Sequence, residues 1–101
     1  MNDKRIDLSK KNLSGKDLSN RDLKRANLKR SKLKEADLTG ADLRRANLRR
    51  ANLTGANLTG ANCANSDFCD AILEAVVWRG AKLDGAIFSN QTTAQDTPKP
   101  E

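Results

Sequence analysis

Eight basic residues form four adjacent pairs, of which the first two recur twenty positions later as the other two. Side chains of this type can bind anions. The segment LKRANLKR at residues 23–30 returns as LRRANLRR at residues 43–50, with the cations in the same places. Lysine and arginine donate charge-assisted hydrogen bonds to phosphate and carboxylate oxygens. The pattern therefore predicts an anion-binding site. The candidate residues, which we call the basic surface, are Lys24, Arg25, Lys29, Arg30, Arg44, Arg45, Arg49 and Arg50.

The same charges are also compatible with a solvated face that has no ligand. Two unit charges about 5 Å apart in water repel by less than about 1 kcal/mol, and salt screens them further. Asp22 and Asp42 stand close to the basic pairs and relieve the repulsion, whereas Lys10 extends the cluster. Two interpretations stay open at this point: a solvated face, or a site for nucleic acid, an acidic protein or an anionic membrane surface.

Charge is distributed unevenly along the 101 residues, which have a net charge of +6. Residues 1–50 contain 16 basic and 7 acidic residues (+9), and residues 51–101 contain 3 and 6 (−3). This asymmetry favours an anionic partner for the first half. No apolar run is long enough to span a membrane, and residues 1–12 lack the apolar core of a signal peptide. We therefore expect a cytoplasmic protein without a transmembrane segment.

The chain contains few residues that could serve as catalytic groups of an enzyme. Histidine and tyrosine are absent, and no glycine-rich phosphate loop occurs. The two cysteines, Cys63 and Cys69, are too few for a zinc site or a disulfide framework. We expect no catalytic residues, no metal site and no cofactor.

The basic residues are set in a sequence with a period of five. From Leu8 to Phe88 an apolar residue, mostly leucine, falls at every fifth position. Alanine usually stands two residues before it, and Asp or Asn one residue before it in twelve of seventeen units. This period suits neither a helix nor a plain strand, because both would scatter the leucines over several faces. Three extended residues followed by a two-residue corner fit the pattern, with glycine where the backbone needs a positive φ.

The segment ADLTGADLRRANLRRANLTGANLTGAN, residues 36–62, resembles the pentapeptide-repeat family with its motif A(D/N)LXX. The resemblance covers seventeen in-phase units over residues 6–90. It implies an all-β fold, a right-handed quadrilateral parallel β-helix of about four coils, with Ala and Leu inside. Four units per coil would place each copy of the basic segment directly over the other. We expect an N-terminal lead at 1–5, the β-helix at 6–90 and a disordered polar tail at 91–101.

The first coil departs from the motif with charged residues. Lys11, Lys16 and Arg21 replace the inward alanine. Burying an unpaired charge is costly, so these side chains should leave through the open first end. They would form either a charged cap that blocks edge-to-edge association or a contact with a ligand.

The last coils depart from the motif with apolar residues. We call them the C-terminal apolar set and predict an interface there. Gyrase-binding members of the resembled family dimerise through their C-terminal ends, which suggests a homodimer. The alternatives are a tail that folds over these residues, or bulky side chains that fill a terminal coil. The set comprises Ile72, Val77, Trp78, Ile87 and Phe88.

The predicted function is a non-enzymatic repeat scaffold or interaction module with the basic surface as its site. One alternative is a DNA-mimicking modulator of DNA gyrase, like the fluoroquinolone-resistance proteins of the resembled family. The basic corners of this chain disfavour such an acidic mimic. A purely structural protein without a ligand is a second alternative. An ice-binding array of Ser19, Thr39 and Thr59 is a third, although three hydroxyls are few.

Overall fold

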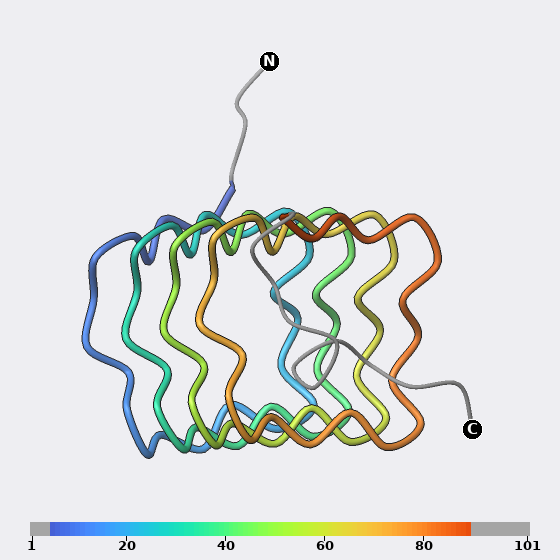
Figure 1. Ribbon diagram of the computed structural model, residues 1–101, viewed down its shortest axis with the longest axis horizontal. Coiled ribbons are helices and arrows are strands. Elements are labelled where there is room, and N and C mark those ends of the chain that lie inside the picture. Colours follow the sequence, from blue (N-terminus) through green and yellow to red (C-terminus); the bar gives the residue numbers. More distant parts are fainter. Residues whose placement is uncertain (1–4, 90–101) are drawn as a thin grey trace.

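The computed structural model describes residues 5–89, which form one stack of coils (Figure 1). Each five-residue unit has three extended residues and a two-residue corner. The corner closes with a backbone hydrogen bond, as from Ala26 N–H to the Leu23 carbonyl at 3.0 Å. Its second residue has a positive φ in every unit from Lys10 to Gly85. Positive φ at this position together with such a hydrogen bond is typical of a type II turn.

Every coil contains twenty residues, because each parallel bridge joins positions twenty apart. Asp7 pairs with Asn27, Asn27 with Asn47, and so on along four sides to Asp67 and Ile87. Within residues 5–89 this pairing consists of thirteen isolated bridges, without a helix or a longer continuous strand. The corners also bond from coil to coil, so the backbone polar groups of the inner coils are paired.

The interior is a narrow column of leucine and alanine, as the period predicts. Leu38, in the middle of the stack, is fully buried, and so are its inward neighbours Ala36 and Ala41. Toward the C-terminal end aromatic rings replace leucine. Phe68 is fully buried, stacks on Phe88 with 5.2 Å between ring centroids, and meets Trp78 edge-on at 5.5 Å.

All twelve Asp and Asn residues that precede the central residue of a unit have the same structural role. In each, a side-chain oxygen accepts a hydrogen bond from the backbone N–H two residues later. Asn52 accepts from Thr54 at 3.1 Å and Asp37 from Thr39 at 3.0 Å. These bonds fix the corners in the manner of Asx-turns. The accepting residues are Asp7, Asn12, Asp17, Asp22, Asn27, Asp37, Asp42, Asn47, Asn52, Asn57, Asn62 and Asp67.

The charged residues of the first coil are placed as the burial argument requires. Lys11, Lys16 and Arg21 are all exposed at the first end of the stack. Most of the predicted lead and the whole predicted tail at 91–101 lie outside the described residues.

Candidate anion-binding site

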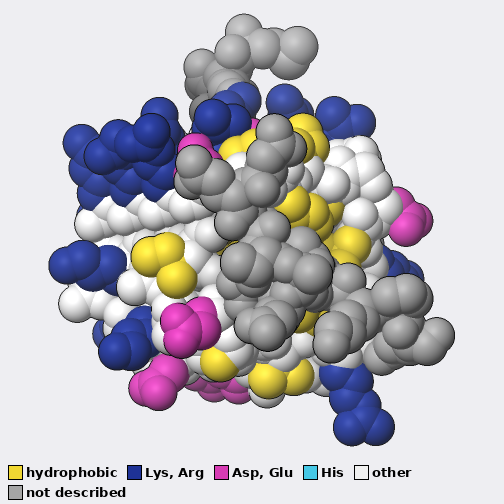
Figure 2. All heavy atoms as spheres, in the orientation of Figure 1, with side chains coloured by type: hydrophobic (Ala, Val, Ile, Leu, Met, Phe, Trp, Pro, Cys, Tyr) yellow, Lys and Arg dark blue, Asp and Glu magenta, His cyan; other side chains and the backbone are white. Residues whose placement is uncertain are grey.

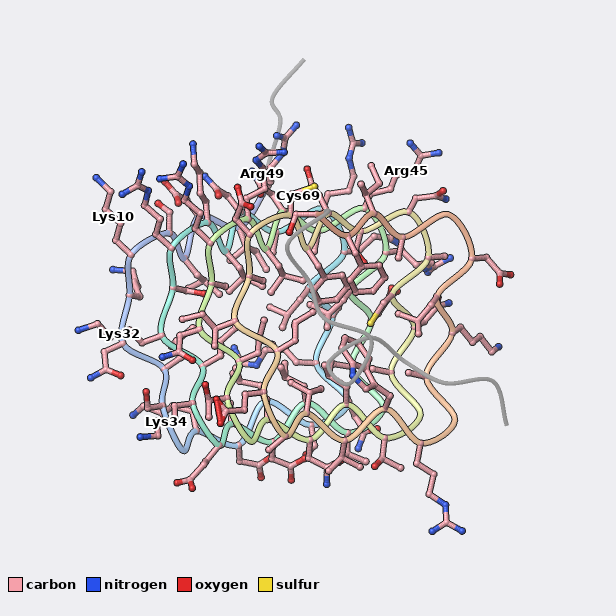
Figure 3. All side chains as sticks on the ribbon, in the orientation of Figure 1. Lys10, Lys32, Lys34, Arg45, Arg49 and Cys69 are labelled. Carbon is pink, nitrogen blue, oxygen red and sulfur yellow. The ribbon has the colours of Figure 1, made fainter. Side chains whose placement is uncertain are left out.

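The basic surface occupies two neighbouring corners of the first three coils. Each corner residue lies over its counterpart, because the backbone bonds from coil to coil. Arg25 N–H donates to the Arg44 carbonyl at 2.8 Å, and Arg30 N–H to the Arg49 carbonyl at 2.9 Å. All eight side chains are exposed. Figure 2 shows Lys and Arg gathered along one edge, and Figure 3 places Arg45 and Arg49 on it with Lys10.

Four arginines of the basic surface adopt a backbone conformation that usually favours glycine. Arg25, Arg30, Arg45 and Arg50 have φ between 59° and 63°. The left-handed conformation costs a residue with a side chain about 1 kcal/mol or more. At the other two corners the same position holds glycine in most units, as at Gly60. The chain thus keeps arginine on the basic side at some conformational cost.

Two arginines of the basic surface form ion pairs. The Arg44 guanidinium lies 2.7 Å from the Asp42 carboxylate, and Arg49 lies 3.0 Å from Asp67, which belongs to the next coil. The hydrogen bond from the Arg44 side chain is the main cause that lowers the pKa of Asp42. Partial burial alone would raise the pKa of Asp67, but hydrogen bonds from Cys69 and Arg49 outweigh it and lower the pKa.

The other six cations of the basic surface have no ion-pair partner among residues 5–89. The sequence pointed to Asp42 as a neutralising residue but missed Asp67. The register between coils would have predicted this pair. Asp67 lies directly over Asn47, and Asn47 is two residues before Arg49. Counting in steps of twenty would have found the pair.

A hollow of about 430 Å³ lies beside the basic surface, between the first and second coils. Sequence reasoning did not anticipate it, although Lys10 and the two basic surface residues in its wall had been singled out. Asn27 and Ser9 had no predicted role in binding. The lining residues are Ser9, Lys10, Asn27, Lys29 and Arg30.

The C-terminal apolar set does not gather on one side of the stack. Ile72, Val77 and Ile87 pair with Asn52, Asn57 and Asp67 respectively, in three separate ladders. They therefore point outward from three different sides, with exposures of 50%, 44% and 52%.

The two aromatic members of that set turn inward instead. Trp78 and Phe88 are half-buried and meet edge-on, with 6.1 Å between ring centroids. The structure thus brings the aromatic members together and separates the aliphatic ones.

The cysteines and acidic groups offer little further chemistry in the part of the chain that the structure describes. Cys63 is buried and Cys69 half-exposed, and both are free thiols. Residues 5–89 hold no cluster of three potential metal ligands. The same residues include no helix long and apolar enough to cross a membrane.

Comparison with sequence families gives a match along the stack. The profile of pentapeptide repeats (8 copies) matches residues 4–40, 12–50, 36–74 and 46–90. Among curated proteins no match is found.

Several solved structures are similar to this chain. HetL from the cyanobacterium Nostoc sp. strain PCC 7120, a pentapeptide repeat protein involved in heterocyst differentiation regulation, is 35% identical with a TM-score of 0.75. The match covers 80% of this chain but only 39% of HetL. The pentapeptide repeat protein alr5209 from Nostoc is 30% identical over 85% of this chain and 77% of its own, with a TM-score of 0.76. AT2G44920 from the Arabidopsis thaliana thylakoid lumen is 33% identical over 90% and 70% respectively, with a TM-score of 0.56.

Proposed function

This chain belongs to the pentapeptide-repeat family, and we propose that it is a non-enzymatic scaffold whose basic surface binds an anionic macromolecule. One observation carries the proposal. Eight basic side chains are stacked on two adjacent corners, and six of them have no ion-pair partner among residues 5–89. Clustered charges of one sign on one face raise the local concentration of anions and steer their approach.

Nucleic acid is the anionic macromolecule that the basic surface fits best, through its phosphates alone. Base stacking needs exposed aromatic rings beside the cations. The three aromatic residues, Phe68, Trp78 and Phe88, instead contact one another inside and at the C-terminal end of the stack. Binding should therefore be indifferent to sequence and strongly weakened by salt. The basic corners give no support to an acidic mimic of DNA.

The finer description of the scaffold belongs to the same proposal. We take it to be a right-handed β-helix of about four coils over residues 6–90, in a cytoplasmic protein, with a lead at 1–5 and a tail at 91–101. The twenty-residue spacing of the bridges supports the coil count. A homodimer through the C-terminal end stays a prediction, and light scattering of the purified protein tests it.

The test is fluorescence anisotropy with labelled single-stranded DNA, duplex DNA and heparin at several salt concentrations. The informative variant replaces Arg25, Arg30, Arg45 and Arg50 with asparagine, which tolerates a positive φ. We expect binding at low salt that falls steeply as salt rises, and a loss of at least about tenfold in the variant.

A matched control removes four positive charges from other sides of the stack. Lys32, Lys34, Arg79 and Lys82 are exposed and lie outside the basic surface, so their replacement with glutamine should cost much less affinity. Equal losses in the two variants would mean that net charge, rather than the basic surface, binds the polymer. No binding to any of the three polymers at low salt would rule out nucleic acid as the partner, and no binding to acidic protein or anionic vesicles either would refute the proposal. Binding of acidic protein or anionic vesicles alone would reassign the partner.

A further inference from the structure

We propose that the hollow at one edge of the basic surface is a defined binding site for a doubly charged phosphoryl group, a phosphate monoester or a diphosphate. This inference deepens the proposed function, because the hollow adjoins the basic surface. Its lining brings together three cations from two coils, Lys10, Lys29 and Arg30, with the polar residues Ser9 and Asn27.

The polar groups around the hollow are set up to donate rather than accept. Lys10, Lys29 and Arg30 form no ion pair with any residue in 5–89. The Asn27 side-chain oxygen already accepts from Lys29 N–H at 3.1 Å, which leaves its NH₂ group for a ligand. The Ser9 hydroxyl is occupied, since it donates to Asp7 at 2.7 Å.

One carboxylate stands close to these cations and must be counted. Asp7 lies one coil below Asn27 in the same ladder. Hydrogen bonds from the hydroxyl and the backbone N–H of Ser9 hold it in place and lower its pKa. The three lining cations outnumber Asp7 by two, and Lys11, whose charge also acts on Asp7, adds to the excess. That excess matches a phosphate monoester, which carries about −1.5 to −2 at neutral pH, better than a singly charged phosphodiester.

The backbone beneath these side chains is fixed before any ligand arrives. Lys10 N–H donates to the Lys29 carbonyl at 3.0 Å, which ties the two coils together at this corner. Lys10 and Arg30 both have a positive φ, 62° and 61°, in closed turns. A preorganised site loses less entropy on binding. The volume, about 430 Å³, is within the range of ligand pockets and leaves room for a sugar attached to the phosphoryl group.

Two sources could supply such a group: the 5′-phosphate end of a nucleic acid strand, or a free nucleotide. The first experiment compares 3′-labelled single-stranded oligonucleotides of identical sequence that carry either a 5′-phosphate or a 5′-hydroxyl. We expect the wild-type protein to bind the phosphorylated strand about tenfold more tightly, as charge-assisted hydrogen bonds to a terminal group would give. Competition by a nucleoside monophosphate at similar concentration would assign the free nucleotide as a ligand as well.

Two triple variants, each losing three positive charges, separate the hollow from the rest of the basic surface. The first variant should lose the preference for the 5′-phosphate; it combines Lys10→Gln, Lys29→Gln and Arg30→Asn. The control variant should bind both oligonucleotides equally more weakly than wild type and keep the preference for the 5′-phosphate. It combines Lys24→Gln, Arg25→Asn and Arg45→Asn. A preference that survives in the first variant, or is missing in the wild type, would overturn the inference.

A second measurement keeps this inference testable even if no polymer binds and the proposed function fails. Sodium pyrophosphate is titrated into isotope-labelled full-length protein, and the backbone amide resonances are followed by NMR. We expect saturable shifts concentrated at Lys10, Asn27, Lys29 and Arg30. Small shifts spread over all basic residues, like those caused by added chloride, would count against a defined site.

Discussion

Replacing Leu38 with alanine tests whether the narrow interior is one continuous core. Leu38 is fully buried in the middle of the stack, between the fully buried Leu58 and the nearly buried Leu18 of its column. Its backbone is fixed by a 2.8 Å bond to the Asn57 carbonyl. The coil therefore cannot collapse far into the space that the lost side chain leaves, and the cost should fall in the upper part of the usual range, about 3–5 kcal/mol.

That loss is large for a stack of this size. Residues 5–89 comprise 85 residues, for which a total unfolding free energy of about 4–13 kcal/mol is expected. Leu38→Ala should lower the melting temperature by roughly 15–30 °C. Thermal and urea unfolding followed by circular dichroism measure the change. Leu13→Ala is the matched control, because Leu13 is only half-buried at the first end of the stack, and it should cost about 1–2 kcal/mol. Equal losses at the two positions would refute the continuous core.

Three further predictions concern the corners, the ion pairs and the thiols. Gly60 has a φ of 69° and nothing within 4 Å of an added Cβ, so Gly60→Ala should cost about 1 kcal/mol through backbone strain alone, measured as a lower melting temperature. The pKa values of Asp42 and Asp67 are lowered below 3.8 in the folded state, so the stability they contribute is complete above that pH and is lost as the pH falls through the folded values. Asparagine at both positions keeps the corner hydrogen bond, and that variant should lose less stability than wild type between about pH 5 and pH 2 in thermal melts. Burial raises the pKa of the Cys63 thiol to about 12, and the hydrogen bond with Asp67 raises the pKa of Cys69, but only Cys69 is partly exposed. Iodoacetamide at mildly alkaline pH should therefore modify Cys69 slowly, and mass spectrometry should find a second adduct only in denaturant.

The fold of this protein was predictable because one five-residue repeat continues without interruption. The five-residue period correctly predicted buried Leu and Ala, exposed first-coil cations and corners with positive φ. Glycine marked only part of those corners, however. Arg45 and Ala75 also have a positive φ, 59° and 60° against 69° at Gly60, because the closing hydrogen bonds impose the turn on whichever residue occupies it. Local propensity was therefore a poorer guide than position in the repeat.

The details of the candidate site were harder to predict, since they depend on side-chain placement between coils. The Arg49–Asp67 ion pair follows from the register once the coil length is known. The hollow at Lys10 and Asn27 does not, because its shape depends on how long side chains spread from a corner. The separation of Ile72 from Ile87 is again a matter of register, which places them in different ladders.

The fixed separation of twenty residues in every bridge also constrains how the length of this chain can change. Loss of five residues between Arg25 and Arg45 would still leave complete units, but everything after the deletion would advance by one side. Arg45 would then no longer lie over Arg25, because Arg50 would take that place, and the basic surface would spread over three corners instead of two. Loss or duplication of twenty residues would preserve every column and only shorten or lengthen the charged strip. Whole coils are thus the steps by which such a surface can grow without losing its alignment.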